Sequence, residues 1–254
     1  MDNNSIKLDV KEVLTESVLL YKENFRHFIG PSLIYFSYLA LMQAIVYLPS
    51  IPQGHPLALA LLLIILPVLL LVVTLLAFKF DLAIMIFADS MFFQCRLPFG
   101  EAYRLTKGKF WLFFGCSMLV GLFTIPSFIL AFFKVPFASQ FGAIYMAFVN
   151  PFFFTLAPMI ALEPKTNRYL TRATKMIKGN YGAVFILTLL TATLLAIING
   201  VFTFMFQGNA LALFIRDIVY ACIHFFLRPF TSIISVIVYR RLVEKTKNKE
   251  RREM

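Results

Sequence analysis

The sequence predicts an all-α, polytopic membrane protein with six transmembrane helices, arranged as three repeats of an interfacial amphipathic helix followed by a helical hairpin. The composition is 60% hydrophobic and 15% charged, with 30 phenylalanines, and the mean hydropathy is +0.80. A soluble globular chain is roughly 45–50% apolar and about 25% charged. Several apolar runs reach the roughly 20 residues that a helix needs to cross a bilayer. A short pattern that recurs three times predicts the repeats.

This recurring pattern is an amphipathic segment that runs directly into an apolar stretch. It reads ESVLLYKENFRHFIG at 16–30, EAYRLTKGKFWLFFG at 101–115 and RATKMIKGNYGAVFI at 172–186. A lysine and, three places later, an aromatic residue align in the three copies: Lys22, Lys107 and Lys178, then Phe25, Phe110 and Tyr181. We assign the repeats, within a single membrane domain that ends in a charged cytoplasmic tail at 241–254, to residues 9–93, 98–162 and 164–240.

The first amphipathic helix is predicted at 9–27. Its apolar side chains recur at helical spacing, and its charged side chains fall on the opposite face. Asp9 followed by Glu12 has the spacing of a capping box. The third copy carries a basic stripe of Arg168, Arg172, Lys175 and Lys178. Such helices suit a membrane interface, with cations near anionic headgroups. The alternative is a surface helix of a soluble domain, but each copy leads into an apolar run of lipid length.

The first two spans are predicted from the apolar runs that follow. Span one covers about 28–48 and ends at the Pro- and Gly-rich segment 49–56. The second run begins near Leu57 and continues to about Phe93, which is too long for one crossing at 1.5 Å per residue. We therefore expect its end to project into the cytoplasm. That places a set of charged residues at or beyond the inner interface: Lys79, Asp81, Asp89 and Arg96.

The four remaining spans are separated by short polar or Pro-containing segments. Spans three and four are predicted at about 110–132 and 138–161, with a turn near 134–136. Pro151 and Pro158 predict a kink in span four, because each proline removes a backbone donor. Spans five and six, which are followed by a solvated or frayed tail, are predicted at about 181–206 and 214–239 with a turn at 207–209.

The basic residues predict the orientation. Of 24 Lys and Arg residues, 21 fall in four segments: 1–27, 79–109, 163–180 and 240–254. The positive-inside rule places these segments, and both termini, in the cytoplasm, with six spans between them. The net charge of +11 is explained by this orientation. We expect no nucleic-acid partner, because no nucleic-acid-binding module is recognisable.

One polar face in span six is the candidate ligand site. Arg216, Tyr220, His224 and Arg228 recur every four residues and so share one helical face. Arg228 is predicted near mid-membrane, where a lone cation costs a few kcal/mol. One interpretation is a polar lining for an anionic or amphiphilic ligand. The other is that Arg228 donates to carbonyls freed by prolines, or to a carboxylate, and locks the bundle.

The remaining polar residues indicate architecture. Asp89 and Glu163 lie near predicted cytoplasmic ends of spans, within reach of the basic amphipathic helices, and we expect them to form salt bridges there. The spacing shows no pair of catalytic carboxylates. The histidines are scattered and lack the spacing of a metal pair: His27, His55 and His224. We find no phosphate-binding loop or nucleophile elbow. We therefore predict no catalytic residue, no metal and no cofactor.

Two stretches resemble a known family. They are LDVKEVLTESVLLYKENFRHFIG at 8–30 and LAPMIALEPKTNRYLTRATKMIKGNYGAVF at 156–185. The second is similar to a pattern in the six-span membrane domain fused to bacterial glycerophosphodiester phosphodiesterases, and in related stand-alone membrane proteins of unknown function. The matching residues are Pro158, Glu163, Ala173, Lys178, Gly179, Asn180 and Tyr181, with Thr174 in place of the usual Ser. The resemblance implies a lipid-related role. We expect no phosphodiesterase activity, because the spans occupy the chain.

Three functions remain open. The first is a non-enzymatic inner-membrane protein that handles, senses or transports a lipid or amphiphilic molecule, with membrane lipids and their anionic headgroups as partners. The second is a scaffold or accessory subunit that binds another membrane protein or a second copy of itself. The third is an intramembrane enzyme that acts on lipid.

Overall fold

The computed structural model describes residues 8–47, 56–95, 97–133, 138–164, 168–206 and 210–253. Within these residues the regular structure is entirely helical, which confirms the all-α prediction. The helices are α1 (Val10–Tyr47), α2 (Pro56–Phe92), α3 (Phe99–Leu105), α4 (Phe110–Phe132), α5 (Ala138–Leu162), α6 (Tyr169–Ile177), α7 (Tyr181–Met205) and α8 (Ala210–Glu253). Arg96 and the predicted turns at 49–55, 134–136 and 207–209 lie outside the described residues.

Among the residues that the structure describes, four segments are long and apolar enough to cross a membrane. They are Leu71–Phe92, Ile144–Leu162, Tyr181–Met205 and Ile215–Thr246. A helix of this length and hydropathy is stable in the hydrocarbon core because all of its backbone groups are bonded within the helix. These four helices indicate a membrane-embedded protein.

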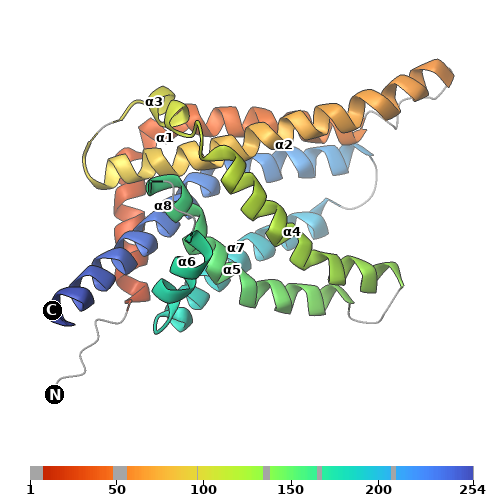
Figure 1. The fold of residues 1–254 in the computed structure, drawn as a ribbon. Helices are drawn as coiled ribbons and strands as arrows, with labels where there is room; N and C mark the ends of the chain where they lie inside the picture. The colour runs from red at the N-terminus through yellow and green to blue at the C-terminus, as the bar shows by residue number, and fades with distance from the viewer. Residues whose placement is uncertain are drawn as a thin grey trace.

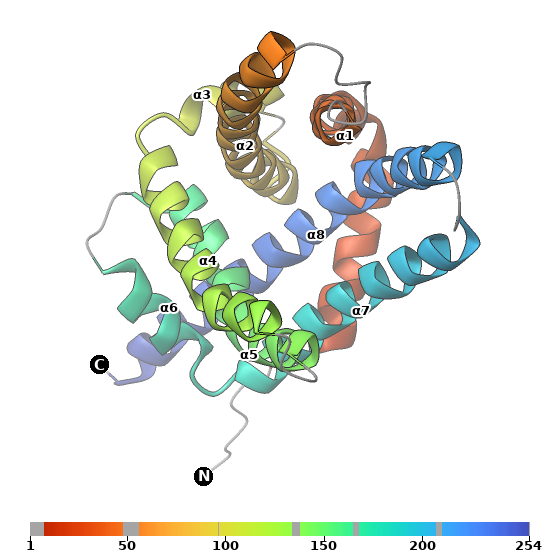
Figure 2. The ribbon, with the colours of Figure 1, turned by 90° about the vertical axis from the view of Figure 1, so that its right-hand side faces the viewer.

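The helices form three pairs around the middle of the molecule. Figure 2 shows α1 with α2, α4 with α5 and α7 with α8, and each pair is in contact. Helix α8 crosses the middle and packs against α1, α2, α5, α6 and α7. The helices converge at the end where both termini lie (Figure 1). The core at this end includes Leu82, Ile84, Met159, Ile233 and Tyr239, all fully buried.

Large apolar side chains are exposed away from this core. Helix α7 is the clearest case, because only 18% of its apolar segment is buried, and Phe204 near its end is 79% exposed. Contiguous apolar surfaces of this kind mark contact with lipid or with another protein. The exposed face of α7 is therefore consistent with a chain whose solvent is a bilayer.

Helix α1 contains both the predicted amphipathic helix and the predicted first span. It is one helix from Val10 to Tyr47 with Pro31 inside it, and its two halves run in different directions (Figures 1 and 2). A proline inside a helix has no N–H to donate, and its ring pushes against the carbonyl four residues earlier, which bends the helix. Here that carbonyl belongs to His27.

The other two copies of the pattern break at a glycine instead. Gly108 has φ 85° and Gly179 has φ 89°, and α4 and α7 each begin two residues later. A side chain disfavours this left-handed conformation by roughly 1–2 kcal/mol. The aligned residue in the first copy is Glu23, and α1 continues through it. The amphipathic segment and the following apolar segment are thus one continuous helix in the first copy and two separate helices in the second and third.

The start of α1 and the end of α8 also differ from the prediction. The Asp9 carboxylate accepts from the N–H groups of Lys11 (2.8 Å) and Glu12 (3.4 Å), so it caps α1. The Glu12 side chain does not complete a capping box, because it binds Arg241. The segment predicted to be a solvated or frayed tail is helical as far as the structure describes it, because α8 continues to Glu253. Arg241 is bonded to Glu12 of α1, and Lys245 to Asn180 in the turn before α7, and these contacts hold the first turns of the segment.

Candidate functional site

Arg228, the central residue of the predicted polar face, is bound to a carboxylate. Its Nε donates to Asp81 Oδ1 of α2 at 2.8 Å, and its Nη2 donates to Asp81 Oδ2. The Asp81 side chain is only 9% exposed, whereas that of Arg228 is 36% exposed. The two residues were predicted at different depths, mid-membrane and inner interface. At least one of these predicted depths is wrong, because the two side chains are in direct contact.

The other three residues of this face lie on α8 but have separate surroundings. Arg216 pairs with its neighbour Asp217 at 2.9 Å. The rings of Tyr220 and His224 are in contact, with centroids 4.3 Å apart. His224 Nε2 is buried and has no hydrogen-bond partner among the described residues. The four residues thus lie in a row along α8, but the guanidinium of Arg228 is bound to Asp81 of α2.

Asp89 forms a second pair between α2 and α8. Arg240 donates to both of its carboxylate oxygens at 2.6 Å, and the guanidinium lies 4.8 Å from the Phe93 ring centroid. Two-point pairs of this geometry fix the register of the helices as well as their distance. The predicted partner of Asp89, a basic amphipathic helix, is thus replaced by the end of α8.

Glu163 joins three helices at the end of α5. It is buried, and its Oε1 accepts from the hydroxyl of Tyr239 in α8 at 2.5 Å. Its Oε2 accepts from Arg172 of α6 at 2.8 Å, so Glu163 pairs with the third amphipathic helix, as expected from the sequence. Burial and the adjacent carboxylate make this hydroxyl a strong, charge-assisted donor. Both carboxylate oxygens are used, which points to an architectural role.

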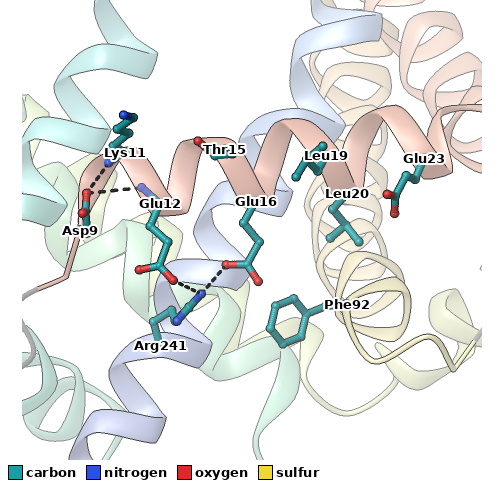
Figure 3. A pocket seen from close by; sticks show the side chains of 10 residues that line it. All are labelled: Asp9, Lys11, Glu12, Thr15, Glu16, Leu19, Leu20, Glu23, Phe92 and Arg241. Atoms are coloured by element: carbon teal, nitrogen blue, oxygen red, sulfur yellow. Dashed lines mark hydrogen bonds and ion pairs between the residues drawn. The ribbon is translucent and has the colours of Figure 1, made fainter.

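A groove of about 650 Å³ runs along the first half of α1. Figure 3 shows Arg241 reaching from α8 into it, toward Glu12 (2.7 Å) and Glu16 (3.1 Å). Asp9, at one end of the groove, is used as the helix cap. Three of the carboxylates that line this groove thus already accept hydrogen bonds from the protein, so few remain for a cationic ligand.

The two glycine turns are held by polar contacts with distant segments. Lys109 Nζ donates to the carbonyl of Ala161 at 2.6 Å, which satisfies a free carbonyl at the end of α5. Burial lowers the pKa of this lysine. In the other turn, Asn180 Oδ1 accepts from Lys245 Nζ at 2.9 Å and from the Leu8 N–H at 3.3 Å.

The aligned lysines differ from the arginines of α8. Lys22, Lys107 and Lys178 are exposed, and among the described residues none pairs with a carboxylate. Lys107 lines a second groove, of about 420 Å³, between α2 and the turn that joins α3 to α4. This groove also contains Lys79 and Trp111. In this groove the ammonium groups of Lys79 and Lys107 therefore lie beside apolar side chains of α2 and α4.

The described residues contain no group of three metal-binding side chains. No model of a known protein family, no curated protein and no solved structure matches this chain. The function must therefore be argued from the arrangement of its own side chains.

Several residues that organise this region were not singled out from the sequence. They are Tyr239, Arg240, Arg241 and Lys109. Asp81 was noted only as an interfacial charge. One signal was present, because Asp81 and Arg228 are isolated opposite charges in long apolar runs, and such charges tend to pair.

Proposed function

We propose that this chain is a six-span, non-enzymatic protein of the bacterial inner membrane that binds an anionic or amphiphilic lipid at its cytoplasmic face. The observation that carries the proposal is the contrast between the two kinds of cation. Arg228, Arg240 and Arg241 are held in ion pairs. The lysines at the aligned positions are exposed and have no described carboxylate partner. Free cations at an interface attract anionic headgroups.

The threefold repeat in this proposal is supported by the burial of aligned side chains. Five places before the aligned lysine, a small residue is buried in every copy: Ser17, Ala102 and Ala173. Six places after it, a large apolar residue is buried in every copy: Phe28, Phe113 and Val184. The aligned lysines are exposed. The three aligned segments thus share the same pattern of buried and exposed side chains.

Six spans and the orientation follow from the same proposal. The four segments with the strongest span character belong to α2, α5, α7 and α8. The second half of α1 and helix α4 complete the three pairs. Arg228 then lies 18 residues from the start of α8, or about 27 Å at 1.5 Å per residue. Because the hydrocarbon core is about 30 Å thick, this length supports a position of the Arg228–Asp81 pair near the inner interface, where its cost is lower.

A scaffold role is the second candidate, and the exposed face of α7 favours it. A partner helix from another membrane protein would cover this face as well as lipid does. The resemblance to the phosphodiesterase-associated membrane domain agrees with either role.

Native mass spectrometry of the delipidated protein tests the lipid proposal. We expect phosphatidylglycerol to bind more tightly than phosphatidylcholine, by about tenfold. The variant Lys22→Gln/Lys107→Gln/Lys178→Gln should lose this preference. A control with the same charge change outside the amphipathic stripe of the third copy, Lys11→Gln/Lys249→Gln/Arg251→Gln, should keep it. Equal binding of both lipids by the wild type would refute the proposal, and a stoichiometric protein partner in its place would favour the scaffold role.

A further inference from the structure

We propose that the groove between α2 and the α3–α4 turn is a binding site for one anionic phospholipid. Lys79 and Lys107 hold the phosphate, and the acyl chains lie along the apolar wall beside them. This inference rests on the proposed lipid-binding function and assigns it a location.

The groove joins two stretches that are separate in the sequence, one in α2 and one that runs from the turn into α4. Val72, Leu76 and Lys79 come from successive turns of α2, Lys107 and Gly108 from the turn, and Trp111 from the start of α4. Its volume is about 420 Å³, which suits a glycerophosphate headgroup and the first carbons of its chains. The left-handed conformation of Gly108 (φ 85°) lets the turn fold back toward α2.

The cationic end of the groove is available to a ligand. Lys79 Nζ lies 4.2 Å above the ring of Tyr103, which fixes the ammonium by a cation–π contact. Among the described residues this ammonium has no hydrogen-bond acceptor, so donors remain for a ligand. Among the described residues no carboxylate pairs with Lys79 or Lys107. A phosphate bridging the two lysines would supply the missing negative charge.

The apolar end of the groove is open toward the lipid-facing surface. Val72 and Leu76 are exposed, and their face continues along α2 through Val68 and Ile65, which are also exposed. Trp111 is 70% exposed. Tryptophan prefers the headgroup level of a membrane, where the ring is in contact with chains and its N–H with polar groups. An anionic headgroup attached to acyl chains matches both ends, whereas a soluble anion matches only the lysines.

The sequence provides a local probe, because Trp111 is the only tryptophan of the chain. The protein is reconstituted in phosphatidylcholine bilayers that contain increasing amounts of phosphatidylglycerol with brominated chains, which quench tryptophan fluorescence on contact. Brominated phosphatidylcholine gives the reference for non-selective contact. We expect phosphatidylglycerol to quench Trp111 with a relative binding constant about tenfold above that reference.

The variant Lys79→Gln/Lys107→Gln should reduce this ratio to about one. The control Lys11→Gln/Arg251→Gln removes two exposed cations that lie outside the groove and should leave the ratio unchanged. Thermal melting and gel filtration verify that the variants are folded, and a single Lys79→Gln variant provides the intermediate value.

The possible results separate this site from the general function. If native mass spectrometry shows a preference for phosphatidylglycerol but Trp111 shows none, the site is wrong and the lipid-binding function stands. If both variants lower the ratio equally, diffuse charge attraction explains the binding and the site is again wrong. If soluble glycerol 3-phosphate releases the quenching at millimolar concentration, the ligand is the free anion and not a phospholipid. If neither method shows a preference, function and site fail together.

Discussion

Arg228 of α8 and Asp81 of α2, which lie 147 residues apart in the sequence, form a two-point ion pair between these helices. The carboxylate is almost fully buried and the guanidinium is partly exposed. A second pair, Arg240 with Asp89, joins the same two helices further along. The two pairs fix both the distance and the register of α2 against α8. They also show that the cation with the clearest functional signal in the sequence, Arg228, is bound to a carboxylate of another helix.

Removal of one partner of the first pair should destabilise the fold. In Arg228→Met the carboxylate of Asp81 stays buried without its cation, and we expect a loss of about 2–3 kcal/mol in the free energy of unfolding. This is below the roughly 3–5 kcal/mol of a fully buried pair, because the guanidinium is partly screened by its surroundings. The double variant Asp81→Asn/Arg228→Met should recover more than half of the loss. Denaturation in mixed detergent micelles measures it, and additive single losses would contradict the pair.

The hydroxyl of Tyr239 should be worth more than an ordinary tyrosine hydroxyl, because it donates to the charged Glu163. We expect Tyr239→Phe to lower the free energy of unfolding by about 1.5–3 kcal/mol. Tyr21→Phe is the matched control, since Tyr21 donates to the backbone carbonyl of Phe226 at 2.9 Å. Its loss should be about 0.5–1.5 kcal/mol. Burial raises the pKa of Tyr21 to about 12, so this donor stays protonated under the conditions of the test. Equal losses would show that Glu163 adds nothing.

Glycine is required in the turn before α7 for its backbone conformation. Gly179 has φ 89°, and nothing lies within 4 Å of a Cβ placed on it. Gly179→Ala should therefore cost about 1–2 kcal/mol through the backbone alone. Gly182, inside α7, also has open space around it but an ordinary helical conformation. Gly182→Ala should stabilise the protein by about 0.5–1 kcal/mol. A thermal melt compares the two, and a neutral Gly179→Ala would contradict the argument.

The aligned lysines should all lie on the cytoplasmic side of the membrane. In a background with Cys95, Cys116 and Cys222 replaced by alanine, we expect Lys22→Cys, Lys107→Cys and Lys178→Cys to react with an impermeant maleimide only after the inner face is opened. Val135→Cys, in the predicted turn on the opposite side, should react in intact cells. A lysine position that reacts from outside would end both the repeat and the proposed orientation.

Local features of the sequence predicted most helix ends well. Span three was predicted at about 110–132 and α4 is Phe110–Phe132; span five was predicted at about 181–206 and α7 is Tyr181–Met205. These ends are readable because an apolar run has a definite length and is bounded by Gly, Pro or charge. The long second run also appears as one helix, Pro56–Phe92. The end of α8 was missed, since a charged segment looks like a tail unless its partners are known.

The sequence by itself determined that this chain is helical and apolar enough for a bilayer, because these properties depend on composition and on spacing along one helix. Only the tertiary structure decided which cationic and anionic side chains form ion pairs. From the sequence, Arg228 could bind a ligand, a freed carbonyl or any of several carboxylates. It binds Asp81 because α2 and α8 pack in the orientation that brings the two side chains together. Contacts between residues so far apart are set by the whole arrangement of helices, and no local pattern contains that information.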